Sequence, residues 1–157
     1  MSDHGDDITE VSLSFPLDPD GYLRRECPTC ERELKRLHVE GRGSDVAELH
    51  CPYCGVAANT ETSWFTPAQL VHMRQAAIDQ TGVGAALDDL ERSIASLNRT
   101  GGMLRASFER PERPEPLAET NDMRAVSFAC HPDERIKVLD DWTGPVHCTV
   151  CGETTAP

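Results

Sequence analysis

The stretch from Cys27 to Gly55 decides the fold. It begins Cys27-Pro28-Thr29-Cys30, continues for twenty residues, and ends Cys51-Pro52-Tyr53-Cys54-Gly55. Each Cys-x-x-Cys segment, called a hook below, can direct two sulfur atoms at one point. Four thiolates around Zn²⁺ form a closed tetrahedral site that leaves no open position for a substrate. We therefore expect Cys27, Cys30, Cys51 and Cys54 to bind one structural metal ion.

The residues around these hooks predict β-strands. Apolar residues within 34–39 indicate one strand, Gly-Arg-Gly-Ser at 41–44 supplies a turn, and residues 46–50 lead back to the second hook. This order predicts a β-hairpin between the two hooks. Alternating apolar and polar residues at 11–15 predict a further short strand before the first hook.

A second, altered copy of this pattern lies near the end of the sequence. It reads Cys130-His131-Pro132-Asp133-Glu134-Arg135 and later His147-Cys148-Thr149-Val150-Cys151-Gly152. Both copies share Cys-x-x-(Cys or Asp)-Glu-Arg and His-Cys-x-x-Cys-Gly. The glycine after the last cysteine suits a turn that requires positive φ. The repeat therefore predicts a second metal site that includes Cys130, Cys148 and Cys151.

The fourth ligand of the second site has two candidates. Asp133 stands where the first copy has a cysteine, whereas His131 offers an imidazole, which zinc prefers over a carboxylate in structural sites. We favour His131 and keep Asp133 as the alternative. The matching residues His50 and His147 are interpreted as strand residues or as hydrogen-bond donors to the ligands.

The sequence predicts no catalytic residues. A zinc ion with three protein ligands and one water would be a catalytic arrangement, but it also needs a general base in a pocket. The acidic pair Asp140-Asp141 is better explained as turn residues before Trp142. We therefore expect a protein that is not an enzyme.

The hooks resemble those of the zinc ribbon, or rubredoxin-like, group of folds. The resemblance covers residues 22–56 and 126–153 and is carried by the cysteines and the glycine after each final hook. It implies metal-binding β-hairpins but no particular function, because such ribbons occur in transcription factors, ribosomal proteins, electron carriers and protein-interaction adaptors. Rubredoxins bind iron in similar hooks. Because this hairpin carries several charges and few aromatic residues, we expect zinc, with two ions per chain.

Two helices are predicted between the copies. Thr66-Pro67-Ala68-Gln69 has the pattern of a helix start, with Thr66 as N-cap and Gln69 completing a capping box, and this helix should run to about Gln80. The second helix is predicted from Val83 to Asn98, before Gly101-Gly102. Its apolar residues repeat at alternating spacings of four and three: Val83, Leu87, Leu90, Ile94 and Leu97. This stripe predicts packing against the first helix, and a homodimer through the 83–97 helix stays open as the alternative.

The predicted fold class is a small α+β metal-stabilised protein. Two zinc-ribbon β-hairpin modules are connected by a helical hairpin and a Pro-rich linker, whose length lets the last segment sit apart. The predicted divisions are a disordered acidic tail at 1–9, a first ribbon at 10–65, a helical hairpin at 66–100, a Pro/Glu/Arg linker at 101–123 and a second ribbon at 124–157.

Charge and composition narrow the expected partners and location. The net charge of −12 repels phosphate backbones and so disfavours nucleic acid as a partner. Six basic residues nevertheless gather around the first hook: Arg24, Arg25, Arg32, Lys35, Arg36 and Arg42. No apolar run predicts a signal peptide or a membrane span. We therefore expect a cytoplasmic protein, and in that reducing compartment paired hooks are more typical of metal ligands than of disulfides.

These observations lead to three functional hypotheses. The first is a non-enzymatic zinc-binding adaptor or regulatory module that acts through protein–protein interaction. The alternative is a nucleic-acid-binding or transcription-related zinc ribbon that uses the basic residues around the first site. A rubredoxin-like electron carrier is the third hypothesis and has the least support, because no flavin or haem motif accompanies the hooks.

Overall fold

The structure, a computed structural model, describes residues 10–39, 47–59, 64–102, 105–110 and 112–155. The predicted tail at 1–9 and the predicted turn at 41–44 lie outside these ranges. The described chain is a small α+β protein with two helices and antiparallel sheets. None of its helices has the length and apolar character needed to cross a membrane.

The chain forms two compact units. One contains Phe15–Gln69 and Leu117–Pro157 and is called the cysteine unit, because it holds all seven cysteines. The other contains Met1–Ser14 and Leu70–Pro116 and is called the helical unit. The division into five segments stays a prediction.

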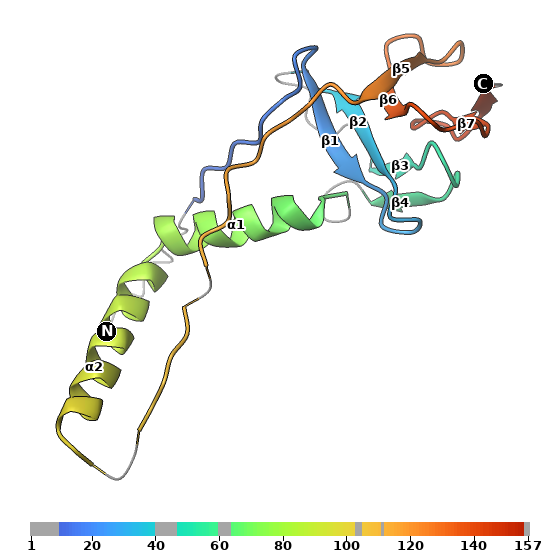
Figure 1. Ribbon diagram of the computed structural model, residues 1–157. Helices are drawn as coiled ribbons and strands as arrows, with labels where there is room; N and C mark the ends of the chain where they lie inside the picture. Colours follow the sequence, from blue (N-terminus) through green and yellow to red (C-terminus); the bar gives the residue numbers. More distant parts are fainter. Residues whose placement is uncertain (1–9, 40–46, 60–63, 103–104, 111, 156–157) are drawn as a thin grey trace, which may run out of the picture. The chain divides into compact units, whose positions relative to one another are not determined.

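A four-stranded antiparallel sheet is the centre of the cysteine unit (Figure 1). Its strands in spatial order are β1 (Tyr22–Glu26), β2 (Glu33–Leu37), β6 (Arg135–Leu139) and β5 (Met123–Ser127). The two inner strands come from different copies of the repeat and pair at Lys35 with Lys137 and at Arg36 with Ile136. The expectation that the last segment sits apart is therefore wrong, because both copies share one sheet.

Two small hairpins complete the cysteine unit. One joins β3 (Glu48–His50) to β4 (Ala57–Asn59), and the other joins β7 (Val146–His147) to β8 (Thr154–Thr155). The predicted hairpin between the first two hooks is wrong, because β2 pairs with β1 and β6 whereas β3 pairs with β4. Each hook instead reverses the chain between two paired strands, since its tight turn brings its own flanking residues together.

The core of the cysteine unit lies among the sheet and the hooks. Phe128, Ile136 and Val138 are buried beside Leu34, and Trp64 is buried with them at 2% exposure. Residues 10–18 form no strand, which contradicts the strand predicted at 11–15. Phe15 is anchored by its ring instead, 5.9 Å from that of Phe65.

Both inner strands carry a buried lysine. Lys35 is fully buried, and its ammonium lies 2.8 Å from Asp122 and 3.1 Å from Glu119. Lys137 is 3% exposed and donates to Asp18 at 2.8 Å. Because buried ammonium groups need partners, these ion pairs hold residues 118–122 and the loop around Asp18 against the sheet.

Two helices follow the first copy. In α1 (Pro67–Gln80), the predicted capping box is confirmed: Thr66 N–H donates to the Gln69 side chain at 3.0 Å, and Gln69 N–H donates to the Thr66 hydroxyl at 3.2 Å. The second helix, α2 (Val83–Arg99), also agrees with its prediction, and Gly101 follows it at φ +73°.

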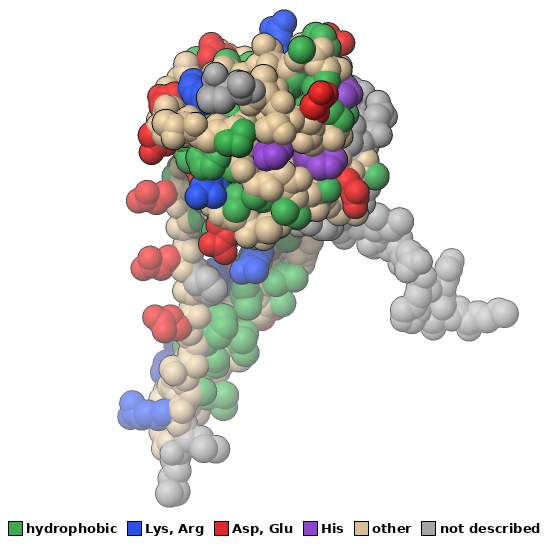
Figure 2. Space-filling model, turned by 90° about the vertical axis from the view of Figure 1, so that its right-hand side faces the viewer, with side chains coloured by type: hydrophobic (Ala, Val, Ile, Leu, Met, Phe, Trp, Pro, Cys, Tyr) green, Lys and Arg blue, Asp and Glu red, His purple; other side chains and the backbone are tan. Residues whose placement is uncertain are grey.

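The predicted packing of the two helices as a hairpin is wrong. Among the described residues, α1 and α2 do not pack along their lengths. Val83, Leu90 and Leu97 are 51%, 44% and 60% exposed. Figure 2 shows hydrophobic side chains along one side of α2. The linker runs back along the helices instead, and its ion pairs to helix carboxylates explain why: Arg110 to Asp88 and Glu91, and Arg113 to Asp79.

Candidate metal centres

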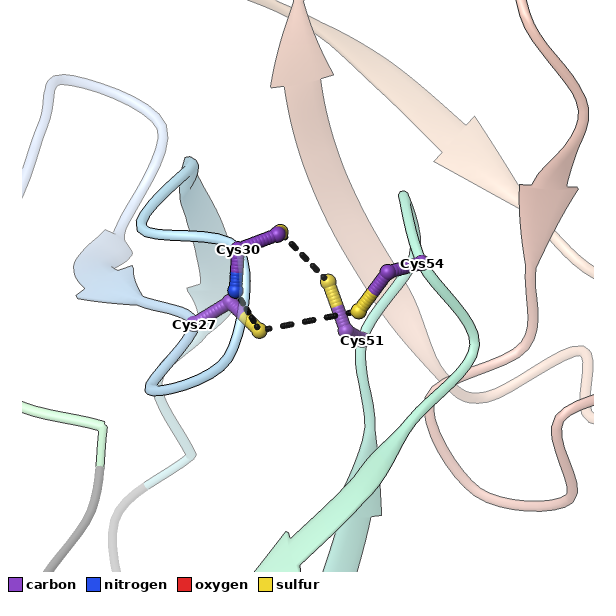
Figure 3. Close-up of side chains that lie close together, drawn as sticks. All are labelled: Cys27, Cys30, Cys51 and Cys54. Atoms are coloured by element: carbon purple, nitrogen blue, oxygen red, sulfur yellow. Dashed lines mark hydrogen bonds between the residues drawn. The ribbon is translucent and has the colours of Figure 1, made fainter.

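Two hairpin turns bring the four cysteines of the first cluster together. Cys27 and Cys30 lie between β1 and β2, and Cys51 and Cys54 lie between β3 and β4. Their side chains point toward one another in Figure 3, with all four sulfur atoms within 4.8 Å of each other. The Sγ atoms of Cys27 and Cys54 are 3.9 Å apart, and those of Cys30 and Cys51 are 3.7 Å apart. These separations exclude disulfides, and all seven cysteines are free.

The spacing of these sulfur atoms fits a tetrahedral metal ion. Sulfur atoms at a Zn–S distance of about 2.3 Å are roughly 3.8 Å apart along the edges of a tetrahedron. Backbone N–H groups also point at the sulfur atoms: Thr29 donates to Cys27 Sγ and Tyr53 donates to Cys51 Sγ, each at 3.4 Å. Such hydrogen bonds stabilise the negatively charged thiolate, which is the form of cysteine that binds a metal cation.

The chain turns sharply after each complete hook. Glu31, Gly55 and Gly152 follow the last cysteine of their hooks and have φ of 57°, 71° and 75°. Each donates its N–H to the carbonyl of the first cysteine in its hook, at 2.9, 2.9 and 2.8 Å. The two glycines were expected at such turns. Glu31 was not, since a glutamate gives no sequence signal for positive φ.

The second cluster comes from the turns between β5 and β6 and between β7 and β8. It contains Cys130, His131, Cys148 and Cys151, whose ligand atoms all lie within 4.8 Å of one another. Cys130 Sγ is 3.6 Å from Cys151 Sγ, and His131 Nδ1 is 3.5 Å from Cys148 Sγ. The structure therefore places His131 in the cluster rather than Asp133, whose side chain is exposed. Adjacent Cys and His side chains reach the same point here.

The buried thiolates of the first cluster require a compensating positive charge. Burial raises the pKa of the Cys51 thiol well above its usual range, and the neighbouring Cys27 adds to this effect. A buried thiolate is costly unless a cation or hydrogen bonds compensate it. A divalent metal ion supplies that charge. In each of the two clusters, the four ligand atoms lie close enough together that they could hold one ion.

The two histidines beside the hooks are not part of either cluster. His50 lies in β3 and His147 lies in β7, as expected for strand residues. Each ring packs against the glycine of the opposite copy. A Cβ added to Gly55 would lie 3.0 Å from His147 Cε1, and a Cβ added to Gly152 would lie 2.8 Å from His50 Cδ2.

The basic residues around the first hook are used inside the fold. Arg24 pairs with Glu33, Glu119 and Asp122, and Arg36 pairs with Glu134 at 2.7 Å. Lys35 is buried in its own ion pairs. The guanidinium of Arg25 lies 4.9 Å from the Phe65 ring centre, and that of Arg32 lies 5.1 Å from the Trp142 ring. Arg42 lies outside the described residues.

Sequence reasoning missed a residue that ties the first cluster to the other copy. The hydroxyl of Tyr53, within the second hook, donates to the Glu33 carbonyl at 2.6 Å and accepts from Leu139 N–H at 2.9 Å. Burial raises the pKa of Tyr53 to about 12. Nothing in the sequence signalled this role, because it depends on the pairing of β2 with β6.

The predicted turn at Asp140-Asp141 is present, since both side chains are exposed and Trp142 N–H donates to the Leu139 carbonyl at 3.1 Å.

All eight predicted ligands are brought together, four in each cluster, and whether they bind metal stays a prediction. No protein-family model, no curated protein and no solved structure matches this chain.

Proposed function

We propose that this chain is a non-enzymatic zinc-binding module in which two zinc ribbons form one folded unit that acts through protein–protein interaction. The observation that carries the proposal is the pair of four-donor clusters, each with ligand atoms within 4.8 Å of one another. Four protein donors fill the coordination of a tetrahedral ion and leave no position for a substrate. The metal is therefore structural.

Zinc suits these donors better than other common divalent ions. Thiolate and imidazole are the ligands of structural zinc sites, whereas magnesium and calcium take oxygen ligands. The small core supports a structural role for the metal. Short strands and hooks bury few side chains, so a central ion would supply part of the stability.

A protein partner is favoured over nucleic acid. The net charge of −12 opposes binding to a phosphate backbone, and five of the six basic residues at the first hook contact carboxylates or aromatic rings of the same unit. In contrast, α2 leaves Val83, Leu90 and Leu97 exposed on an apolar stripe. A stripe of this kind is typical of a surface that contacts another protein.

Metal content tests the structural role. We expect two zinc ions per chain by elemental mass spectrometry of protein purified without added metal, one in a Cys51→Ser/Cys54→Ser variant and one in a Cys148→Ser/Cys151→Ser variant. A Thr29→Ser variant, changed in the hook but not at a ligand, serves as control and should keep both ions. Iron in place of zinc would move the electron-carrier hypothesis ahead, and metal-free folded protein would contradict the proposal.

Nucleic-acid binding separates the proposal from its alternative. We expect no retention of duplex DNA or single-stranded RNA by the zinc-loaded protein at low salt. Salt-dependent binding that weakens in an Arg25→Glu/Arg32→Glu variant would favour the nucleic-acid-binding ribbon instead.

A further inference from the structure

The two copies of the repeat are arranged as a dimer within one chain. β1 and β2 pair with Tyr22 opposite Leu37 and Glu26 opposite Glu33, and β5 and β6 pair in the same way, with Met123 opposite Leu139 and Ser127 opposite Arg135. Between the copies, Lys35 of β2 lies directly opposite Lys137 of β6. Lys35 and Lys137 are each the central residue of a five-residue strand, so the two strands meet at matching positions, as across the two-fold axis of a symmetric dimer.

The hooks are joined across this axis by two matching backbone hydrogen bonds. His50 N–H donates to the Thr149 carbonyl at 2.9 Å, and its counterpart His147 N–H donates to the Pro52 carbonyl at 2.9 Å. Both acceptors lie inside the opposite copy's final hook, between its two cysteines. Each hook is therefore held by the strand that leads to the other hook.

The histidine rings repeat this exchange. The ring of His50 lies over Gly152 and the ring of His147 lies over Gly55, so each covers the turn that closes the opposite cluster. A side chain larger than hydrogen at either glycine would meet the ring. His50 Nδ1 is buried and has no hydrogen-bond partner among the described residues, whereas His147 Nδ1 lies 3.2 Å from the carbonyl oxygen of Gly152 in its own copy.

Side chains strengthen the same interface. Glu134, directly after the altered hook of the second copy, accepts from Arg36 of the first copy at 2.7 and 3.1 Å and from the Thr149 hydroxyl at 2.7 Å. Tyr53 reaches in the other direction, from the first cluster to Leu139 of β6. Both clusters are thus part of one continuous network of contacts.

We propose that metal binding at the two clusters is coupled through these exchanged contacts, with His50 and His147 as positioning residues for the cluster of the opposite copy. A metal ion at one cluster fixes its hook, and that hook presents the carbonyl and the glycine on which the other copy's histidine rests. Loss of either ion then loosens the other hook and speeds release of its ion. This inference rests on the proposed function, because it requires that both clusters bind metal.

Cobalt-loaded protein tests the coupling, because the absorption bands of Co²⁺ differ between a four-thiolate site and a three-thiolate, one-imidazole site. Release to an excess of chelator is then followed separately for each cluster. In His50→Ala, we expect release from the second cluster to be about fivefold faster, whereas the initial rate of release from the adjacent first cluster, measured while the second cluster still holds its ion, should change by less than about twofold. His38→Ala, at an exposed histidine of the same unit, is the matched control and should leave both rates unchanged.

The pattern of effects decides between coupling and local damage. A histidine that merely supports its neighbour Cys51 would speed the initial release from the first cluster while the second cluster is still loaded, and this result would overturn the proposal. His50→Phe should restore slow release from the second cluster, because a flat ring can still pack on Gly152.

A variant that removes the second site tests the reciprocal effect. In Cys148→Ser/Cys151→Ser, release from the first cluster should be about fivefold faster than in the wild type. An unchanged rate would overturn the coupling even if His50→Ala failed to fold. Wild-type protein that binds fewer than two ions would instead overturn the proposed function, so the two failures are distinguishable.

Discussion

At the scale of single residues, Gly152 has two separate reasons to be glycine. Its φ of +75° is unfavourable for any residue with a Cβ, and a Cβ there would lie 2.8 Å from the His50 ring. Gly21 has a similar φ of +84°, but its added Cβ would only reach Leu37 Cδ1 at 3.9 Å. Comparing an alanine substitution at Gly152 with one at Gly21 therefore separates the cost of backbone strain from the cost of steric overlap.

We predict that Gly152→Ala lowers the free energy of unfolding of zinc-loaded protein more than Gly21→Ala does. The control should cost ~1 kcal/mol from backbone strain alone. Gly152→Ala should cost at least ~2 kcal/mol, because the ring of His50 must also move. Guanidinium denaturation of both variants measures the difference, and equal losses would mean that the ring does not press on this glycine.

Asp18 is the carboxylate that the two copies share. It is 4% exposed, and its Oδ2 atom is 2.8 Å from Lys137 and 3.5 Å from Lys35, while Oδ1 accepts from the Tyr22 and Asp20 N–H groups. Asp18→Asn keeps the shape but leaves two buried ammonium groups with less negative charge. We expect a loss of ~2 to 3 kcal/mol in unfolding free energy, measured by denaturation, because an uncompensated buried charge is strongly destabilising.

The same variant gives a pH prediction. Burial opposes ionisation of Asp18, but hydrogen bonds from Lys137, Tyr22 and Asp20 outweigh it and lower its pKa. A lowered folded-state pKa stabilises the protein above the unfolded value of about 3.9, and this stabilisation is lost as the pH falls through the folded value. The difference between wild type and Asp18→Asn should be constant from about pH 6 to 8 and shrink below about pH 4. A difference that shrinks near neutral pH would contradict the assignment.

At the scale of elements, the capping box of α1 lies within the cysteine unit and joins the first turn of the helix to β1. Thr66 is buried and its hydroxyl caps the helix, while Gln69 also donates to the Arg24 carbonyl of β1 at 2.9 Å. We predict that Thr66→Val, which keeps the shape and removes the acceptor, costs ~1 kcal/mol. Thr66→Ser keeps the hydroxyl and should cost less. Denaturation followed by circular dichroism compares them, and an equal cost would assign the effect to packing.

The same helix shows what the sequence could predict. A helix start is written in a few adjacent residues, so Thr66, Pro67 and Gln69 located α1, and the spacing of apolar residues located α2. Strand pairing is different because it joins residues far apart in the chain. The residues 34–39 indicated a strand, but nothing in them showed that β2 would pair with β6, about a hundred residues later.

The positions of the candidate metal ligands could be predicted for a related reason. Cys-x-x-Cys spacing reflects the geometry of one metal site, so the repeat identified all three cysteines of the second cluster. The choice between His131 and Asp133 rested on ligand chemistry, and the structure places the histidine in the cluster. The apolar stripe of α2 led to the wrong prediction that this helix packs against α1, because its spacing predicts a buried face but does not identify what would cover it.

At the scale of the whole molecule, the predicted metal ligands are distributed unequally between the two units. All eight lie in the cysteine unit, as do both tryptophans, Trp64 and Trp142. The helical unit contains α2 and most of α1, and the described linker residues pair with its carboxylates. Tryptophan fluorescence therefore reports on the cysteine unit, whereas far-ultraviolet circular dichroism is dominated by the helices.

We predict that removal of metal by a chelator unfolds the cysteine unit first. Trp64 is 2% exposed, so its emission should shift to longer wavelength as the hooks open and water reaches the indole. The helical signal should fall less, because no ligand lies in the helical unit, although an isolated helix of this length is marginal in water. Added zinc should reverse the emission change. Tryptophan emission that stays constant while metal is lost would show that the strands fold without the ions.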